Sequence, residues 1–197
     1  MIFVGGMGRS GTSVLMECLK NSGYNIGREC LLHGHKYKSE YIPLFTTLNW
    51  LFISIFERDK LINKSEWDVL NSMANFTIIE GVEVLKVLKL SFFLPFLKHH
   101  DIAKDPKFIL MFRDIDEAIA SSYRLSGFPV SNYDVIKSYI DSWNNISEGH
   151  PTIRIKHEDL INNTEEVKKK LSVFLDRDID MSIISPKETY EVSGSVH

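Results

Sequence analysis

The first segment of the chain constrains its fold more than any other. Residues 2–4 form a short apolar run typical of a buried strand, and a glycine-rich stretch, residues 5–11, follows it. Apolar residues then recur at helical spacing from Thr12 to Asn21, and Gly23 follows as a typical helix stop. In such a unit the loop N–H groups and the positive end of the helix dipole converge on one place. The sequence therefore predicts an anion-binding loop between a strand and a helix.

The loop has the glycine spacing of a Walker A sequence but lacks the Walker lysine. Gly6 and Gly11 have the separation of the two Walker glycines, and Ser13 stands where that motif has its magnesium-binding hydroxyl. Thr12 occupies the lysine position, and the basic residue of the loop is Arg9. The Walker lysine neutralises the β- and γ-phosphates, so its replacement argues against hydrolysis of a nucleoside triphosphate. Arg9 instead offers a fixed charge with bidentate geometry.

Short apolar strands and amphipathic helices alternate along the rest of the chain. Further strands are predicted at residues 82–87, 107–112 and 152–155, and further helices at residues 39–58, 65–74, 90–99, 116–124, 133–148 and 164–175. Residues 24–38, which are rich in polar side chains, are predicted to form a loop. The alternation predicts an α/β fold with a mainly parallel sheet. Because no repeat or linker interrupts it, residues 1–197 are expected to form a single domain.

The net charge argues against several kinds of partner. It is −3 at pH 7, so no global basic field points to a nucleic acid or an anionic membrane surface. An anionic ligand therefore requires a local basic site. The N-terminus has no signal-peptide pattern, and no apolar stretch reaches the about 20 residues that span a bilayer. We expect a cytoplasmic protein without a membrane span.

The cysteines indicate neither a disulfide framework nor a metal site. Cys18 and Cys30 are the two cysteines of the chain, and they form no C-x-x-C pair. Cys18 falls in the apolar helical stretch, so a buried and unreactive thiol is expected there. No metal ligands are expected.

The glycine loop resembles the 5′-phosphosulfate loop of the sulfotransferases that use 3′-phosphoadenosine 5′-phosphosulfate (PAPS). That loop has the form [KR]-S-G-T-[ST] after a buried strand, and the matching residues here are Arg9, Ser10, Gly11, Thr12 and Ser13. The resemblance implies that these residues, together with Gly8, bind the donor. It also implies that Arg9 stabilises the departing 5′-phosphate during transfer.

Two later segments strengthen this resemblance. Arg113 directly follows the strand predicted at residues 107–112, and Ser121 lies eight positions further on. They resemble the arginine–serine pair with which the family holds the 3′-phosphate. Residues 153–160, Ile-Arg-Ile-Lys-His-Glu-Asp-Leu, resemble the family's strand and R-[YF]-E-D-L segment. The donor carries two separate anionic groups, and the sequence offers two anion sites.

The resemblance implies a fold, a reaction and a cofactor. The fold is a three-layer α/β/α P-loop domain, and the reaction moves a sulfuryl group from PAPS to a hydroxyl or amine. The product of the donor is adenosine 3′,5′-bisphosphate, and the reaction requires no metal. The acceptor stays open, since a carbohydrate, a lipid, a small phenol and a peptide tyrosine all fit; the oligomeric state stays open too.

The general base is less well defined. Cytosolic small-molecule sulfotransferases have a K-x-H pattern at a strand end, whereas here Lys86 is followed two positions later by Leu88. We expect Glu40, at the predicted start of the helix over residues 39–58, to be the base. His35 and then His33, in the preceding loop, are the reserve candidates. Lys86 is a fourth catalytic candidate because it ends a predicted strand near the loop.

Two other functions stay open. A P-loop kinase for a small metabolite would require a nucleoside triphosphate and magnesium, and Thr12 in the lysine position argues against it. A sulfotransferase-like domain without activity would bind adenosine bisphosphate but transfer nothing, and Leu88 in place of the histidine favours that alternative. Nucleotide preference and magnesium dependence separate the kinase from the other two.

Overall fold

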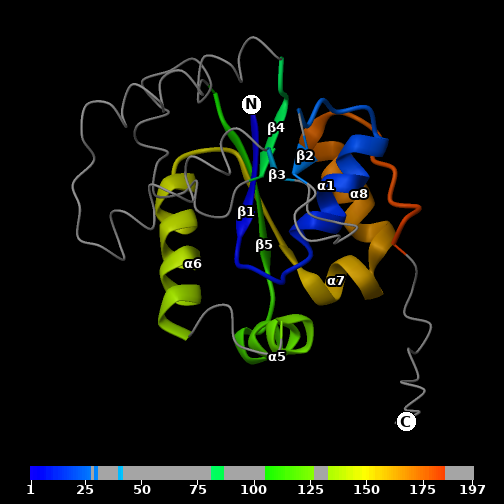
Figure 1. Cartoon of the computed structure of the whole chain (residues 1–197). Coiled ribbons are helices and arrows are strands. Elements are labelled where there is room, and N and C mark those ends of the chain that lie inside the picture. Colours follow the sequence, from blue (N-terminus) through cyan, green and yellow to red (C-terminus); the bar gives the residue numbers. More distant parts are fainter. Residues whose placement is uncertain (28, 31–39, 42–80, 87–104, 127–132, 185–197) are drawn as a thin grey trace, which may run out of the picture.

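The computed structural model describes residues 1–27, 29–30, 40–41, 81–86, 105–126 and 133–184 (Figure 1). Four parallel strands form its main sheet in the order β4-β1-β5-β6. They are β1 (Ile2–Gly6), β4 (Val84–Lys86), β5 (Lys107–Phe112) and β6 (Thr152–Lys156). The predicted α/β class with a mainly parallel sheet is confirmed.

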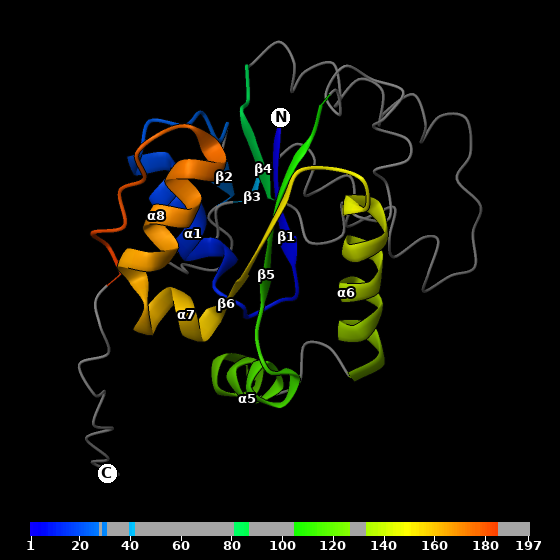
Figure 2. The ribbon, with the colours of Figure 1, turned by 180° about the vertical axis from the view of Figure 1, so that it is seen from behind.

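Helices cover both faces of this sheet, which gives three layers (Figures 1 and 2). One face carries α1 (Thr12–Asn21), α7 (His157–Asn162) and α8 (Thr164–Leu175), and the other carries α6 (Tyr133–Ser147). Helix α5 (Ile115–Ser126) lies across the carboxyl ends of the strands. A small antiparallel pair, β2 (Glu29–Cys30) and β3 (Glu40–Tyr41), completes the described elements.

Strand β1 is buried on both faces because each face packs against a helical layer. Ile2 and Val4 belong to the apolar core that includes residues of α1 and α8. On the other face Phe3 stacks on Phe108 of β5, with ring centroids 5.5 Å apart. Gly5 lies against Trp143 of α6 so closely that a Cβ there would collide with the indole ring. The side chains of β1 therefore fit between two layers, because Phe3 packs on Phe108 and the missing side chain of Gly5 leaves room for Trp143.

Several elements have the bounds expected from the sequence. Helices α1 and α8 and strand β5 coincide with the predictions for residues 12–21, 164–175 and 107–112. Gly23 and Gly149 follow α1 and α6 with φ of 82° and 76°, a conformation that glycine adopts readily. The Cys18 thiol is buried as expected, and burial, with the charge of Asp180 as the next cause, raises its pKa to about 12. None of the described helices has the length and apolarity needed to cross a membrane.

The prediction for Glu40 is wrong in its local structure. Glu40 does not begin a helix but lies in β3, where it pairs with Cys30 of β2. Cys30 belongs to residues 24–38, which were predicted to form a loop. A strand pair of two residues each is too short to produce a periodic pattern in the sequence. Ser39 and Pro43, by contrast, are residue types typical of the first turn of a helix, and they led to the wrong prediction. The remainder of that predicted helix and the helices expected at residues 65–74 and 90–99 lie outside the described residues.

Candidate anion-binding site

The site lies at the carboxyl edge of the sheet, where adjacent parallel strands release their loops side by side. Gly6 at the end of β1 has a φ of 112°, and a Cβ there would collide with the carbonyl oxygen of Met111 in β5. The chain then turns through Met7, whose N–H donates to that carbonyl at 3.3 Å and whose sulfur accepts from the N–H of Arg113 at 3.3 Å. The loop after β1 is thereby attached to the end of β5.

The start of α1 has no side-chain cap, so the backbone N–H groups of the loop after β1 and of the first helical turn are left for a ligand. Arg9 and Gly11 have positive φ angles, 65° and 89°. Ser10 is buried, and its hydroxyl donates to the carbonyl of Met7 at 2.6 Å, which holds the turn closed. Gly11 caps α1 without a side-chain hydrogen bond, and the first turn of α1 carries no acidic residue. This is the open helix N-terminus that an anion requires.

The two predicted phosphate motifs come together at this edge. The Nε of Arg9 donates to the Oγ of Ser121 in α5 at 3.3 Å. The Nη1 of Arg113 donates to the backbone carbonyl of Arg9 at 3.4 Å. Arg9, Arg113 and Ser121 were identified from segments more than 100 residues apart, and the fold makes them neighbours.

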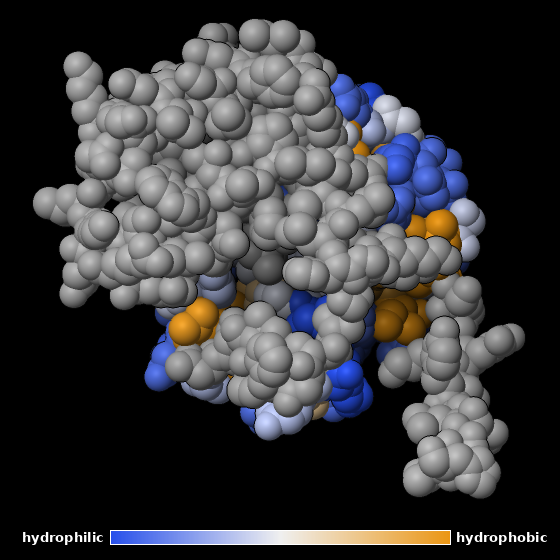
Figure 3. Space-filling model, in the orientation of Figure 1, coloured by the Kyte–Doolittle hydropathy of each residue, from blue (hydrophilic) through white to orange (hydrophobic). Residues whose placement is uncertain are grey.

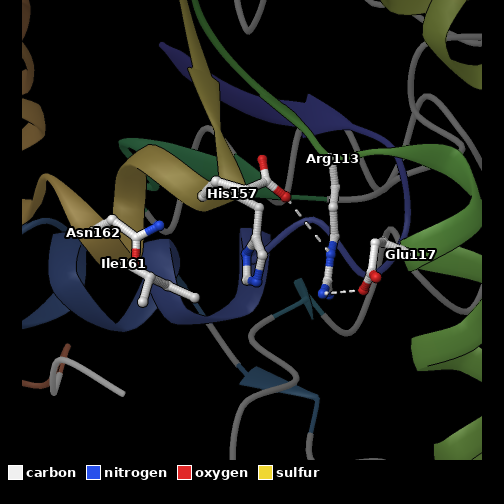
Figure 4. A pocket seen from close by; sticks show the side chains of 6 residues that line it. Arg113, Glu117, His157, Ile161 and Asn162 are labelled. Carbon is white, nitrogen blue, oxygen red and sulfur yellow. Dashed lines mark hydrogen bonds and ion pairs between the residues drawn. The ribbon is translucent and has the colours of Figure 1, made fainter.

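Arg113 lies between two carboxylates (Figure 4). Its Nη2 lies 3.2 Å from Glu117 of α5, and its Nε lies 4.0 Å from Glu158 of α7. The side chain is only 14% exposed, and its Nε has no hydrogen-bond partner among the described residues. A buried guanidinium N–H that is not fully satisfied fits an anionic ligand.

A pocket of about 290 Å³ opens beside Arg113. It is lined by Arg113, Glu117, His157, Glu158, Ile161 and Asn162. Its His157 lies against the loop, since a Cβ on Gly11 would come within 2.9 Å of the imidazole Nδ1. Neither His157 nor Glu117 was identified as a site residue from the sequence, although His157 occupies the aromatic position of the R-[YF]-E-D-L resemblance.

The positive charge at this edge is concentrated. Burial, followed by the charges of Arg113 and Arg124, lowers the pKa of Arg9. Arg9 still carries its charge at neutral pH because a guanidinium does not lose its proton in proteins. Strongly hydrophilic residues reach the surface of the described part near the lower ends of the strands, beside α5 (Figure 3).

Lys86 reaches the loop from the other side of β1. It ends β4, is only 2% exposed, and donates from Nζ to the Oγ of Ser13 at 3.0 Å. Thr12, in the Walker lysine position, is buried at the start of α1. A lysine from the neighbouring strand thus approaches the loop that lacks one of its own.

Of the three candidate general bases Glu40, His35 and His33, the structure describes only the backbone of Glu40. His35 and His33 lie outside the described residues. The backbone of Glu40 lies in β3, which packs beside β4, the strand that carries Lys86. No group of three or more histidine, cysteine or acidic side chains that would suit a metal ion occurs within the described ranges.

No protein-family model matches the chain, and no curated protein matches it either. Among solved structures, the chain is similar to the sulfotransferase domain of the olefin synthase of Synechococcus PCC 7002, with a TM-score of 0.56 and 18% identity over 98% of this chain and 78% of that one. A sugar kinase from Janibacter sp. HTCC2649 gives a TM-score of 0.54 at 12% identity, over 93% of this chain and 97% of that one.

A sulfotransferase domain from the curacin biosynthetic pathway superposes with a TM-score of 0.49 at 18% identity, over all of this chain and 81% of that one. That score is too low to carry an argument. The similarity to the olefin synthase domain shows that this chain shares the three-layer α/β fold of that domain, which is the fold class the sequence predicted. At such identities the comparison concerns the fold alone, and a sugar kinase shares it.

Proposed function

We propose that this protein is a sulfotransferase that moves a sulfuryl group from PAPS to a hydroxyl or amine of an acceptor. The observation that carries the proposal is the junction of the two phosphate motifs, in which Arg9 bonds to Ser121 and Arg113 bonds to the carbonyl of Arg9. A ligand with two separated anionic groups matches two adjoining anion sites better than a ligand with one.

The donor residues divide into two groups. The loop N–H groups and the hydroxyls of Thr12 and Ser13 bind the 5′-phosphosulfate at the start of α1. Gly8, Ser10 and Gly11 shape that loop, and Ser10 does so through its hydrogen bond to Met7. Arg113 and Ser121 bind the 3′-phosphate, and the pocket beside Arg113 accommodates the nucleoside.

The donor supplies an activated sulfuryl group whose bond to the 5′-phosphate oxygen breaks as the bond to the acceptor oxygen or nitrogen forms. Arg9 is placed where negative charge grows on the departing phosphate, and its partial burial strengthens that interaction. Lys86 donates a hydrogen bond from Nζ to the Oγ of Ser13 in the same loop, so its positive charge suits the same task. Transition states of this loose kind depend mainly on positioning and charge stabilisation, and no metal is required.

Glu40 is the proposed general base, which accepts the proton of the acceptor. Its strand lies beside β4, whose last residue contacts the loop. Glu40→Gln keeps the shape of the side chain and removes its basicity, so turnover should fall about 10²-fold while bisphosphate affinity stays unchanged. Near-normal turnover of this variant would transfer the role to His35, then to His33 or Lys86.

Kinase activity is the alternative that one observation favours, since a sugar kinase shares the fold. Thr12 opposes it because the loop lacks the lysine that neutralises the β- and γ-phosphates. Lys86 approaches Ser13 from the neighbouring strand, which makes a direct test worthwhile.

Calorimetry with magnesium chelated tests the proposal. Adenosine 3′,5′-bisphosphate should bind more tightly than ATP, because Arg113 and Ser121 contribute only to a ligand with a 3′-phosphate. Tighter binding of ATP than of the bisphosphate once magnesium is added back would overturn the proposal in favour of a kinase. Transfer of radiolabelled sulfate from PAPS to a panel of sugars, phenols and lipids then tests activity, and bisphosphate binding without any transfer would favour the inactive domain.

A further inference from the structure

One face of α5 carries more of the site than the sequence motif includes. Arg113, Glu117, Ser121 and Arg124 are spaced by four, four and three residues, which places them along one side of the helix and its N-terminal extension. Glu117 contacts Arg113 at 3.2 Å and Ser121 contacts Arg9 at 3.3 Å, so this side faces the loop after β1. Arg124 lies one turn beyond Ser121 on the same side.

Arg124 brings a charge near Arg9 without a compensating carboxylate. Ser121, which precedes Arg124 by about one turn on the same side of α5, bonds to Arg9 at 3.3 Å, and the positive charge of Arg124 is among the causes that lower the pKa of Arg9. Arg113 has Glu117 and Glu158 as ion-pair partners, whereas no ion pair involves Arg124 within the part of the chain that the structure describes. Two neighbouring like charges repel, and an anion between them removes that cost.

We propose that Arg124 is a third cation of the donor site and binds the same phosphate as Ser121, from the side away from Arg113. This inference rests on the proposed function, which assigns the 3′-phosphate to Ser121. Arg124 thereby contributes to the preference for a nucleotide with a 3′-phosphate over one without it. It takes no part in the chemical step, because the leaving group forms at the start of α1 and not at α5.

The test compares two nucleotides on three proteins by calorimetry. Adenosine 3′,5′-bisphosphate and adenosine 5′-monophosphate are titrated into the unmodified protein, Arg124→Ala and Arg154→Ala. Arg154 is the matched control, because it is also an exposed arginine but lies on β6 and donates to Asn144 of α6. Arg124 is exposed, so thermal unfolding of its variant should match that of the unmodified protein.

Arg124→Ala should weaken bisphosphate binding about tenfold and monophosphate binding less than about twofold, and Arg154→Ala should change neither. Arg124→Lys should recover part of the loss because it restores the charge but not the planar geometry. Unchanged affinity for both nucleotides, or an equal loss for both, would overturn the role of Arg124. Failure of the unmodified protein to prefer the bisphosphate would instead overturn the proposed function, so the two failures are distinguishable.

Discussion

Two neighbouring strand-to-helix connections share one edge of the sheet, but they provide for an anion in different ways. The connection from β1 to α1 uses its backbone, with Arg9 and Gly11 in the left-handed region and a helix start that no side chain caps. The connection from β5 to α5 consists of Arg113 and Asp114, and Asp114 caps α5 by accepting the N–H of Glu117 at 3.0 Å. The dipole of α1 is therefore open to a ligand, whereas that of α5 already has a carboxylate.

The two connections therefore contribute differently to ligand binding: one fixes the directions of hydrogen-bond donors, and the other determines which ligand is preferred. The first connection fixes donor directions that any phosphate or sulfate group satisfies. The second connection and α5 contribute side-chain charge instead, through Arg113, Ser121 and the neighbouring Glu117. Changes in the backbone of the first connection should therefore weaken binding of every ligand, whereas changes in the second should alter which ligand is preferred.

The largest effect is expected for Gly11→Ala. The φ of 89° at Gly11 costs an alanine about 1–2 kcal/mol, and its Cβ would come within 2.9 Å of His157. Because the loop must move to relieve this contact, affinity for both adenosine nucleotides should fall at least about 100-fold in calorimetry. Gly149→Ala is the matched control, with a φ of 76° and nothing within 4 Å of the added Cβ. Equal nucleotide affinity in the two variants would contradict the backbone role of this loop.

Arg9→Ala is expected to act next most strongly, and mainly on turnover. Its guanidinium donates to Ser121, and the proposed function assigns the leaving phosphate to this loop. Steady-state kinetics should show kcat reduced about 10²- to 10³-fold, with a smaller change in donor affinity. A variant with normal kcat and only a raised KM would show that Arg9 merely binds the donor.

The local elements of both connections were predictable from the sequence. The apolar runs at 2–4 and 107–112, with helical spacing after each, predicted β1, β5, α1 and α5 to within two residues at each end. Asp114 stands directly before α5, a position where aspartate is a typical N-cap, and it accepts the N–H of Glu117. These features depend on residues close together in the chain, and the pattern therefore contains them.

The contacts between the β1–α1 connection and the neighbouring strands could not be predicted from local sequence patterns. They depend on the strand order β4-β1-β5-β6, which places Lys86 on one side of the loop and Arg113 on the other. Periodicity carries no information on which strands are neighbours, and for the same reason the β2–β3 pairing that holds Glu40 was missed. Arg124 was detectable in principle, since it follows Ser121 at helical spacing, but its nearness to Arg9 comes from the fold.

Arg113→Ala is expected to show a smaller but selective effect. It removes a charge-assisted hydrogen bond worth roughly 1.5–3 kcal/mol, so the affinity for adenosine 3′,5′-bisphosphate should fall about ten- to a hundredfold. Adenosine 5′-monophosphate should be affected much less, because it lacks the 3′-phosphate that the proposed function assigns to Arg113. Calorimetry with both nucleotides decides the matter, and an equal loss for both would assign Arg113 to the loop's geometry rather than to selectivity.

The smallest effect, and an opposite one, is expected for Glu117→Gln. Glu117 is 59% exposed, so its ion pair with Arg113 is screened by solvent and contributes little to stability. Its carboxylate nevertheless competes with a phosphate for the same guanidinium, and glutamine keeps the shape without the charge. Bisphosphate affinity should rise about two- to fivefold at low salt, and the gain should shrink as salt screens the repulsion between Glu117 and the phosphate in the unmodified protein.

Glu165→Gln is the matched control. It removes the same charge from the exposed side of α8, away from the site, and should leave bisphosphate affinity unchanged. A lower bisphosphate affinity of Glu117→Gln would mean that this carboxylate positions Arg113, and that the second connection, like the first, depends on geometry.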